Sequence, residues 1–121
     1  MIAPVTFITD SQMHHLDPEL RTREIENYSE YSFKISRLRT VPVVIGDKCW
    51  FGIYSQIQIA KQGIDRIVIA DGTVVGGGAV VKDPVLEPYK KIAGFPAKII
   101  GNAPPNFTKE ELLKMNLAYW G

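Results

Sequence analysis

The sequence predicts an all-β fold, a parallel β-helix shaped like a triangular prism, from a six-residue repeat and from small residues at fixed places within it. A helical period of 3.6 cannot keep one face at six-residue steps, and a long flat strand would alternate by two. Short strands joined by regular turns therefore fit better. In steps of six, six of seven positions are apolar, with Gly63 as the exception: Ile45, Phe51, Ile57, Gly63, Ile69, Val75 and Val81.

Residue size follows the same six-residue repeat. If each hexad forms one side of a triangular coil, three hexads close a turn, and successive turns stack at the ~4.8 Å spacing of a parallel sheet. The apolar position then points into the prism, and small residues beside it fit the tight corners. An ordinary β-sandwich is the alternative. The fifth place of a hexad is repeatedly small, at Cys49, Ser55, Thr73 and Ala79.

The register is interrupted in three places. The hexad 63–68 lacks its inward residue, so we expect a bulge or local loop there. Residues 1–10 show the six-residue spacing weakly, through Ile2 and Ile8, and are predicted to form a partial first coil. Residues 11–42 have no register and are predicted to be an excursion loop from the prism. Long loops in compact domains are usually functional or disordered.

The C-terminal part of the chain leaves the repeat. Prolines end regular pairing after Val81, so the coils are expected over 43–86 and an extension over 87–107. Thr108 and Glu111 form a capping box ahead of several leucines, which predicts a short helix over 108–119 that could cap the prism. A chain of 121 residues fits a single domain spanning 1–121.

Composition excludes several classes of protein. Hydrophobic residues at 45% and charged residues at 22% are ordinary globular proportions. A net charge of +1 without a run of five like charges argues against nucleic acid as a partner. No apolar stretch approaches the ~20 residues that span a bilayer. A single cysteine, Cys49, and the absence of a secretory signal favour a cytoplasmic location.

The sequence resembles the hexapeptide-repeat acyltransferases, and most closely their xenobiotic and polysaccharide O-acetyltransferase branch. The resemblance implies a left-handed β-helix, acetyl-coenzyme A as co-substrate without a metal, and a homotrimer with sites between subunits. Relatives have further N-terminal coils, so a minimal or truncated member is expected. The matching segments are TDSQMHHLDP at 9–18, PVVIGDKCWFG at 42–52, IADGTVVGGGAVVKD at 69–83, AGFPAKII at 93–100 and NFTKEELLKMNLAYWG at 106–121.

Acetyl transfer to an alcohol or amine needs a base for the acceptor proton, and histidine titrates in the right range. By its place in the resembling segment, His14 is the candidate general base and His15 the fallback. Asp10 and Asp17 are the nearest carboxylates that could orient the ring, although each could instead stabilise a turn. The alternative is that both histidines are solvated loop residues.

Cofactor contacts follow from the resemblance alone. Ser55, Gly76 and Ala79 are expected along the pantetheine arm, Lys82 and Lys98 at the phosphates, and Pro96 beside the adenine; Trp50 either walls the site or packs between subunits. The glycines could instead serve corners, and the lysines could simply be solvated. Arg37 and Arg39 could meet an anionic acceptor, or form a solvated loop face.

The predicted function is transfer of an acetyl group from acetyl-coenzyme A to a hydroxyl or amine of a small molecule or sugar, by direct attack. In the expected homotrimer, the 11–42 excursion of one chain reaches over the coils of the next. One alternative is a zinc-dependent γ-type carbonic anhydrase, which needs three histidines where this chain has two. Another is a catalytically reduced binding or assembly protein, because fold does not imply activity.

Overall fold

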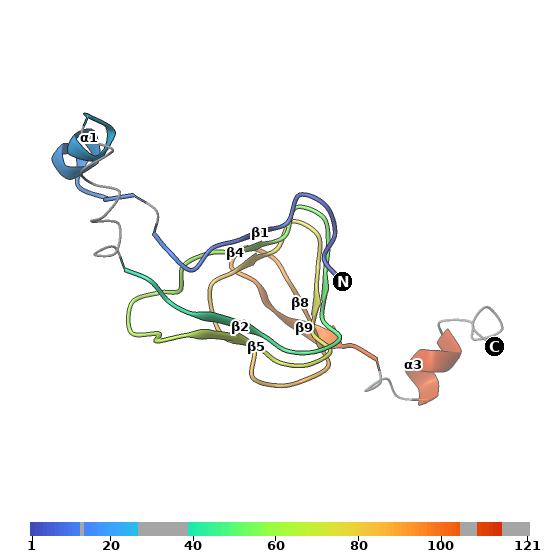
Figure 1. The fold of residues 1–121 in the computed structure, drawn as a ribbon. Helices are drawn as coiled ribbons and strands as arrows, with labels where there is room; N and C mark the ends of the chain where they lie inside the picture. Colours follow the sequence, from blue (N-terminus) through green and yellow to red (C-terminus); the bar gives the residue numbers. More distant parts are fainter. Residues whose placement is uncertain (13, 27–38, 105–108, 115–121) are drawn as a thin grey trace.

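The computed structural model describes residues 1–121 except 13, 27–38, 105–108 and 115–121. Viewed along its axis the main body is a three-sided prism (Figure 1). The first side holds β1 (Phe7–Ile8), β4 (Gln56–Ile57) and β7 (Val80–Val81); the second holds β2 (Val43–Ile45) and β5 (Ile67–Ile69); the third holds β3 (Trp50–Phe51), β6 (Val74–Val75), β8 (Lys90–Ala93) and β9 (Lys98–Asn102).

Strands in successive turns pair in parallel, as the repeat predicts. The antiparallel exception among the described strands is β9, which folds back on β8 at the C-terminal end of the prism. The predicted parallel stacking is therefore confirmed over the coils, and the ordinary β-sandwich alternative is wrong. The coils also continue past their expected end at 86, because β8 pairs in parallel with β6.

The prism interior is built from the predicted inward positions. Five of these side chains are buried, namely Phe51, Ile57, Ile69, Val75 and Val81. Ile45 is 36% exposed, because β2 pairs with β5 on one side only and forms an end of the stack. The small residues at the fifth hexad position are also buried, which fits their predicted place at the corners.

A turn of the coil is longer than three hexads across residues 58–66. Val43 pairs with Ile67 and Trp50 with Val74, a step of 24 residues where three hexads would give 18. The additional hexad contains Gly63, whose φ is +91° and whose missing side chain would face open space. The expected local loop is present, but it is a corner insertion over 58–66 rather than 63–68, because residues 67–69 form β5.

The excursion and the corner insertion leave the prism at the same corner. The excursion follows β1 and the insertion follows β4. Both segments then lead into the second side of the prism, at β2 and β5 (Figure 1). Because β1 and β4 are neighbours in one sheet, the two departures are stacked along the prism axis. This corner therefore brings the base of the excursion, where Arg39 lies, and residues 58–66 together.

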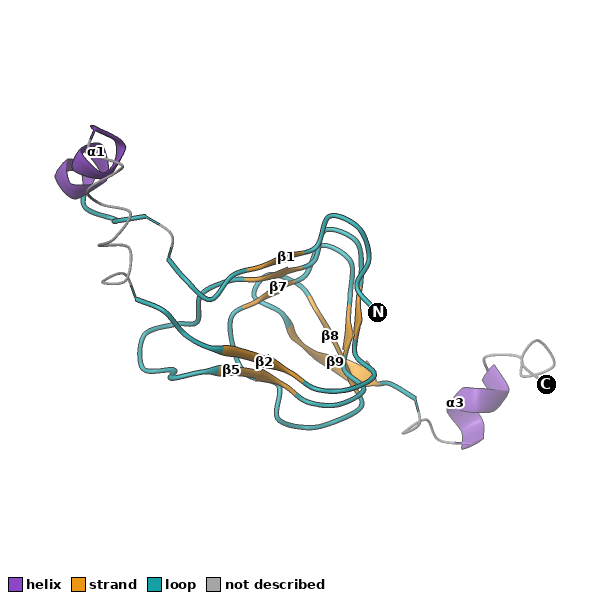
Figure 2. Ribbon diagram, viewed as in Figure 1, coloured by secondary structure: helices purple, strands orange, loops and turns teal. Residues whose placement is uncertain are grey.

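Two helices stand away from the prism (Figure 2). Helix α1 (Pro18–Glu26) lies inside the excursion, so that segment is not the simple loop we expected. Helix α3 (Lys109–Lys114) falls within the predicted 108–119 helix, whose remaining residues lie outside the described ones. In the described part of the chain, neither helix is long and apolar enough to cross a membrane.

Candidate functional site

The base of the excursion is a short antiparallel neck. Ser11 forms a bridge with Thr40, the Val41 N–H donates to the Asp10 carbonyl, and the Gln12 N–H donates to the Arg39 carbonyl. Val41 is buried, whereas Asp10 is exposed. Asp10 therefore contributes a backbone carbonyl to the neck, which anchors the excursion to the prism.

His14 lies just beyond this neck. Its backbone N–H donates to the Gln12 carbonyl at 2.8 Å, and the Gln12 side-chain amide donates to the His14 carbonyl at 3.0 Å. The His14 side chain is 68% exposed. The backbone of His14 is thus fixed by Gln12 while its imidazole remains accessible to an acceptor.

Helix α1 begins immediately after the histidine pair. The Leu20 N–H donates to Oδ1 of Asp17 at 3.0 Å, and Pro18 occupies the first helical position. An aspartate that accepts from the third helical N–H, followed by proline, is a favourable helix start. Asp17 therefore caps α1, in line with the turn-stabilising role that the sequence left open.

A carboxylate from α1 returns to the histidines. Oε2 of Glu24 lies 3.6 Å from Nδ1 of His14 and accepts from the His15 N–H at 3.2 Å. Glu24 is the buried charged residue among those described, with 7% of its surface exposed. The structure therefore brings His14 together with Glu24, a residue that the sequence analysis did not name.

Arg39 ties the excursion to the corner insertion. Its guanidinium donates to the carbonyls of Ala60, Lys61 and Ile64, all within residues 58–66. Arg39 is half-buried, and these bonds give it a structural role that the sequence analysis did not foresee. Its contact with an anionic acceptor stays a prediction. Arg37 lies outside the described residues.

The small residues expected along the pantetheine arm lie at a corner of the prism. Ser55 and Ala79 occupy the same position in successive coils, and both are completely buried. Gly76 is half-buried, and its N–H donates to the Ile92 carbonyl. In the single chain, Ser55 and Ala79 offer no surface to a ligand, because corner packing encloses them.

The residues expected at the nucleotide end lie in the last coil and the β8–β9 connection. Lys98 is exposed, and its Nζ is 3.7 Å from Oδ2 of Asp83, which also accepts from Nζ of Lys61 at 3.1 Å. Pro96 is exposed and Lys82 is half-buried. Lys61 belongs to the corner insertion, so Asp83 joins that insertion to the predicted phosphate-binding region.

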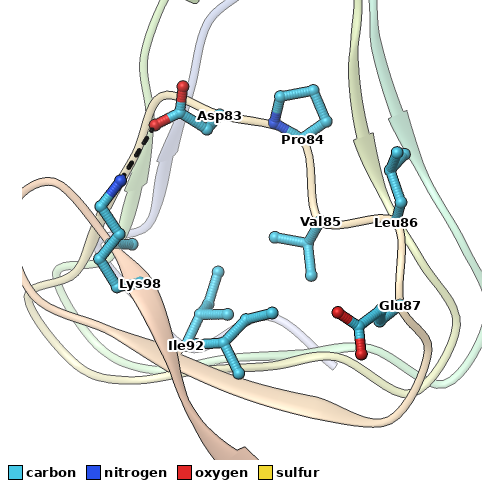
Figure 3. A pocket seen from close by; sticks show the side chains of 9 residues that line it. Asp83, Pro84, Val85, Leu86, Glu87, Ile92 and Lys98 are labelled. Atoms are coloured by element: carbon cyan, nitrogen blue, oxygen red, sulfur yellow. Dashed lines mark ion pairs between the residues drawn. The ribbon is translucent and has the colours of Figure 1, made fainter.

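A pocket of about 500 Å³ opens at this end of the prism (Figure 3). Val85 and Ile92 point into it, while Asp83, Glu87 and Lys98 stand at its edge. Lys98 is the member of the predicted site that lines it. Trp50 lies elsewhere, on β3, and is 43% exposed.

The candidate site is therefore divided within one chain. His14 belongs to the excursion, beyond the corner that follows β1, whereas Gly76, Pro96 and Lys98 belong to the later coils and the C-terminal hairpin. The link between the two parts runs through Arg39, the corner insertion and Asp83. Of the missed residues, Glu24 had a sequence signal, because the Asp17–Pro18 pair predicts a helix start and places Glu24 on that helix.

No family model matches this chain, and no curated protein sequence matches it. Among solved structures, a maltose O-acetyltransferase from Clostridium difficile 630 is 28% identical, with a TM-score of 0.58 over 85% of this chain and 44% of that one.

Two structures of AntD, an N-acyltransferase from Bacillus cereus, show the same fold at lower identity. The variant with dTDP and coenzyme A is 15% identical, with a TM-score of 0.57, over 98% of this chain and 55% of that one. The variant with dTDP-4-amino-4,6-dideoxyglucose and coenzyme A is 17% identical, with a TM-score of 0.57, over 99% and 56%.

The chain thus spans about half the length of these structures. Its three-sided parallel coils, its six-residue repeat and its 28% identity to the maltose O-acetyltransferase agree with the resemblance of its motifs. The chain therefore shares the fold of these acyltransferases, and its sequence is similar to that of the maltose O-acetyltransferase.

Proposed function

We propose that this protein transfers an acetyl group from acetyl-coenzyme A to a hydroxyl group of a small molecule or sugar, with an amine as the alternative acceptor. The supporting observation is the exposed imidazole of His14. Gln12 holds the backbone of this residue beside the neck of a prism whose sequence is similar to that of an O-acetyltransferase. Function resides in sites rather than folds, so His14 is the residue on which the proposal depends.

His14 acts as the general base in this proposal. It takes the proton of the acceptor hydroxyl while the hydroxyl oxygen attacks the acetyl carbonyl, and the new ester forms as the bond from carbonyl carbon to sulfur breaks. The proton then passes from His14 to the departing sulfur, which leaves as the free thiol. A base in this role typically contributes about 10²- to 10⁴-fold in rate.

Coenzyme A would run along the coils toward the C-terminal hairpin. Gly76, Pro96, Lys82 and Lys98 are half-buried or exposed there, which suits contact with a long donor that has phosphates at one end. Ser55 and Ala79 contribute by keeping the corner narrow rather than by direct contact. We assign the coil the left-handed sense of the family that the chain resembles.

The active assembly is proposed to be a homotrimer in which the excursion of one chain reaches the coils of its neighbour. This arrangement would join His14 to the cofactor residues that lie apart from it within a single chain. Exposed apolar side chains on the outer faces, including Trp50 on β3 and Val44 on β2, are available for such contacts. Cyclic symmetry would give three identical sites. Light scattering should report three times the mass of the chain, and a monomeric mass would contradict this assembly.

Acceptor identity is the target of the main experiment. Purified protein is incubated with acetyl-coenzyme A and a panel of sugars and aminoglycoside, streptogramin and phenicol drugs, and release of free thiol is followed. Acceptor-dependent thiol release, lost in His14→Ala, supports the proposal. Coenzyme A binding measured by calorimetry without turnover on any acceptor would favour a catalytically reduced binding protein, and absence of binding would contradict the cofactor assignment.

A further inference from the structure

The burial of Glu24 is unusual for a charged residue on a projecting helix. Helix α1 has exposed charges at Glu19, Arg21, Arg23 and Glu26, while Glu24 is 7% exposed. Removing a carboxylate from water costs free energy unless its oxygens find partners. The position of Glu24 is therefore explained by what its carboxylate contacts.

Among the described residues, the contacts of this carboxylate lie at the candidate base. Oε2 of Glu24 accepts from the His15 N–H at 3.2 Å and lies 3.6 Å from Nδ1 of His14. The second distance is longer than a hydrogen bond, but catalytic hydrogen bonds in ligand-free enzymes often tighten only when substrate is bound. One carboxylate oxygen thus accepts a hydrogen bond from the backbone of His15 and lies near the ring of His14.

We infer that Glu24 is the positioning residue of His14: its carboxylate accepts from Nδ1–H and leaves Nε2 free to take the acceptor proton. This inference deepens the proposed function and rests on it for the catalytic part. A hydrogen bond at one ring nitrogen determines which nitrogen holds the proton in the neutral imidazole. A carboxylate there also stabilises the imidazolium that forms during transfer.

The surrounding contacts favour Glu24 over the two aspartates that the sequence suggested. Asp17 uses Oδ1 to cap helix α1, and Asp10 takes part in the neck through its carbonyl. The guanidinium of Arg21 donates to the carbonyls of His15 and Leu16, which fixes the turn between the histidines and the helix. Helix α1 is therefore held so that its inner carboxylate faces His14.

Nitrogen NMR of the imidazoles tests the contact without requiring turnover. The chain has two histidines, so His15→Gln assigns both sets of signals. At a pH above the titration range of imidazole, the proton of His14 should lie mainly on Nδ1 in the otherwise unaltered protein. Glu24→Met, which keeps a similar volume but removes the acceptor, should shift His14 toward the Nε2–H form.

The matched control is Glu26→Met, which removes an exposed carboxylate from the same helix. It should leave the His14 signals unchanged, and Glu24→Gln, which retains an acceptor oxygen, should restore part of the Nδ1–H population. Identical His14 spectra in the unaltered protein and Glu24→Met would overturn the inference, whatever the activity measurements show.

Turnover separates positioning from a purely structural role. With an acceptor found in the thiol-release panel, Glu24→Met should lower kcat about 100-fold while coenzyme A affinity stays within about twofold, since the base is misaligned and the coils are untouched. Glu26→Met should retain full activity. A tautomer change in Glu24→Met without any loss of kcat would overturn the positioning role but leave the contact and the proposed acetyl transfer intact.

Discussion

The prism and the excursion are stabilised in different ways. In the prism, apolar side chains from successive coils fill a closed interior, and the strands around it repeat in register. The described part of the excursion is held by the backbone neck, by Arg39 and by the buried Glu24. Stability should therefore depend on the coils, while the candidate base should depend on a few polar contacts outside them.

The largest expected effect is on the prism interior. Ile57 is completely buried, and Ile57→Ala should lower the free energy of unfolding by about 2 to 5 kcal/mol, because the close-packed interior cannot collapse around the cavity. Ile8 pairs with Ile57 in the adjacent strand but is 38% exposed. Ile8→Ala should cost clearly less in denaturant titrations, and equal losses would contradict a closed interior that ends at the first coil.

Two corner glycines test how closely the side chains pack at the corners of the prism. Gly72 and Gly78 both have positive φ, near +70°, but a Cβ on Gly72 would meet the Tyr89 ring at 2.1 Å, whereas a Cβ on Gly78 would meet nothing within 4 Å. Lys48 has φ 58° one coil before Gly72, so the backbone angle alone does not require glycine. Gly72→Ala should cost about 2 to 4 kcal/mol and Gly78→Ala about 1 kcal/mol. Equal melting temperatures for the two variants would contradict the role of Tyr89.

The smallest effect on global stability is expected at the junction of the two regions. Arg39→Ala removes three hydrogen bonds to the corner insertion, yet it leaves the coil interior intact. Because local opening can occur without global unfolding, the cost should be about 1 kcal/mol or less, with faster hydrogen exchange confined to 58–66 and the neck. Uniformly faster exchange through the coils would show that the junction supports the prism as well.

The coils could be predicted from sequence because each coil has the same packing requirements. An inward apolar residue every six positions and a small residue at each corner are local requirements, and Phe51, Ile69 and Val75 satisfy them one after another. Even the interruption at Gly63 was visible as a missing inward side chain. The repeat did not predict that this interruption would place residues 58–66 in contact with Arg39.

The candidate site was predicted less completely. His14 followed from motif resemblance, but Glu24 is ten residues away along the chain and reaches it only because helix α1 folds back. The Asp17–Pro18 helix start could have indicated that helix, although the direction of α1 depends on tertiary contacts. The cofactor residues share this difficulty, because small residues at corners look alike whether they are buried, as Ser55 is, or accessible.

The most direct test of the division between prism and excursion is a single substitution at the base. His14→Gln should leave the melting temperature and coenzyme A affinity unchanged, because His14 is exposed and lies outside the coils, while acceptor-dependent thiol release falls about 10²- to 10⁴-fold. Full turnover by this variant, measured on the same acceptor, would contradict the account.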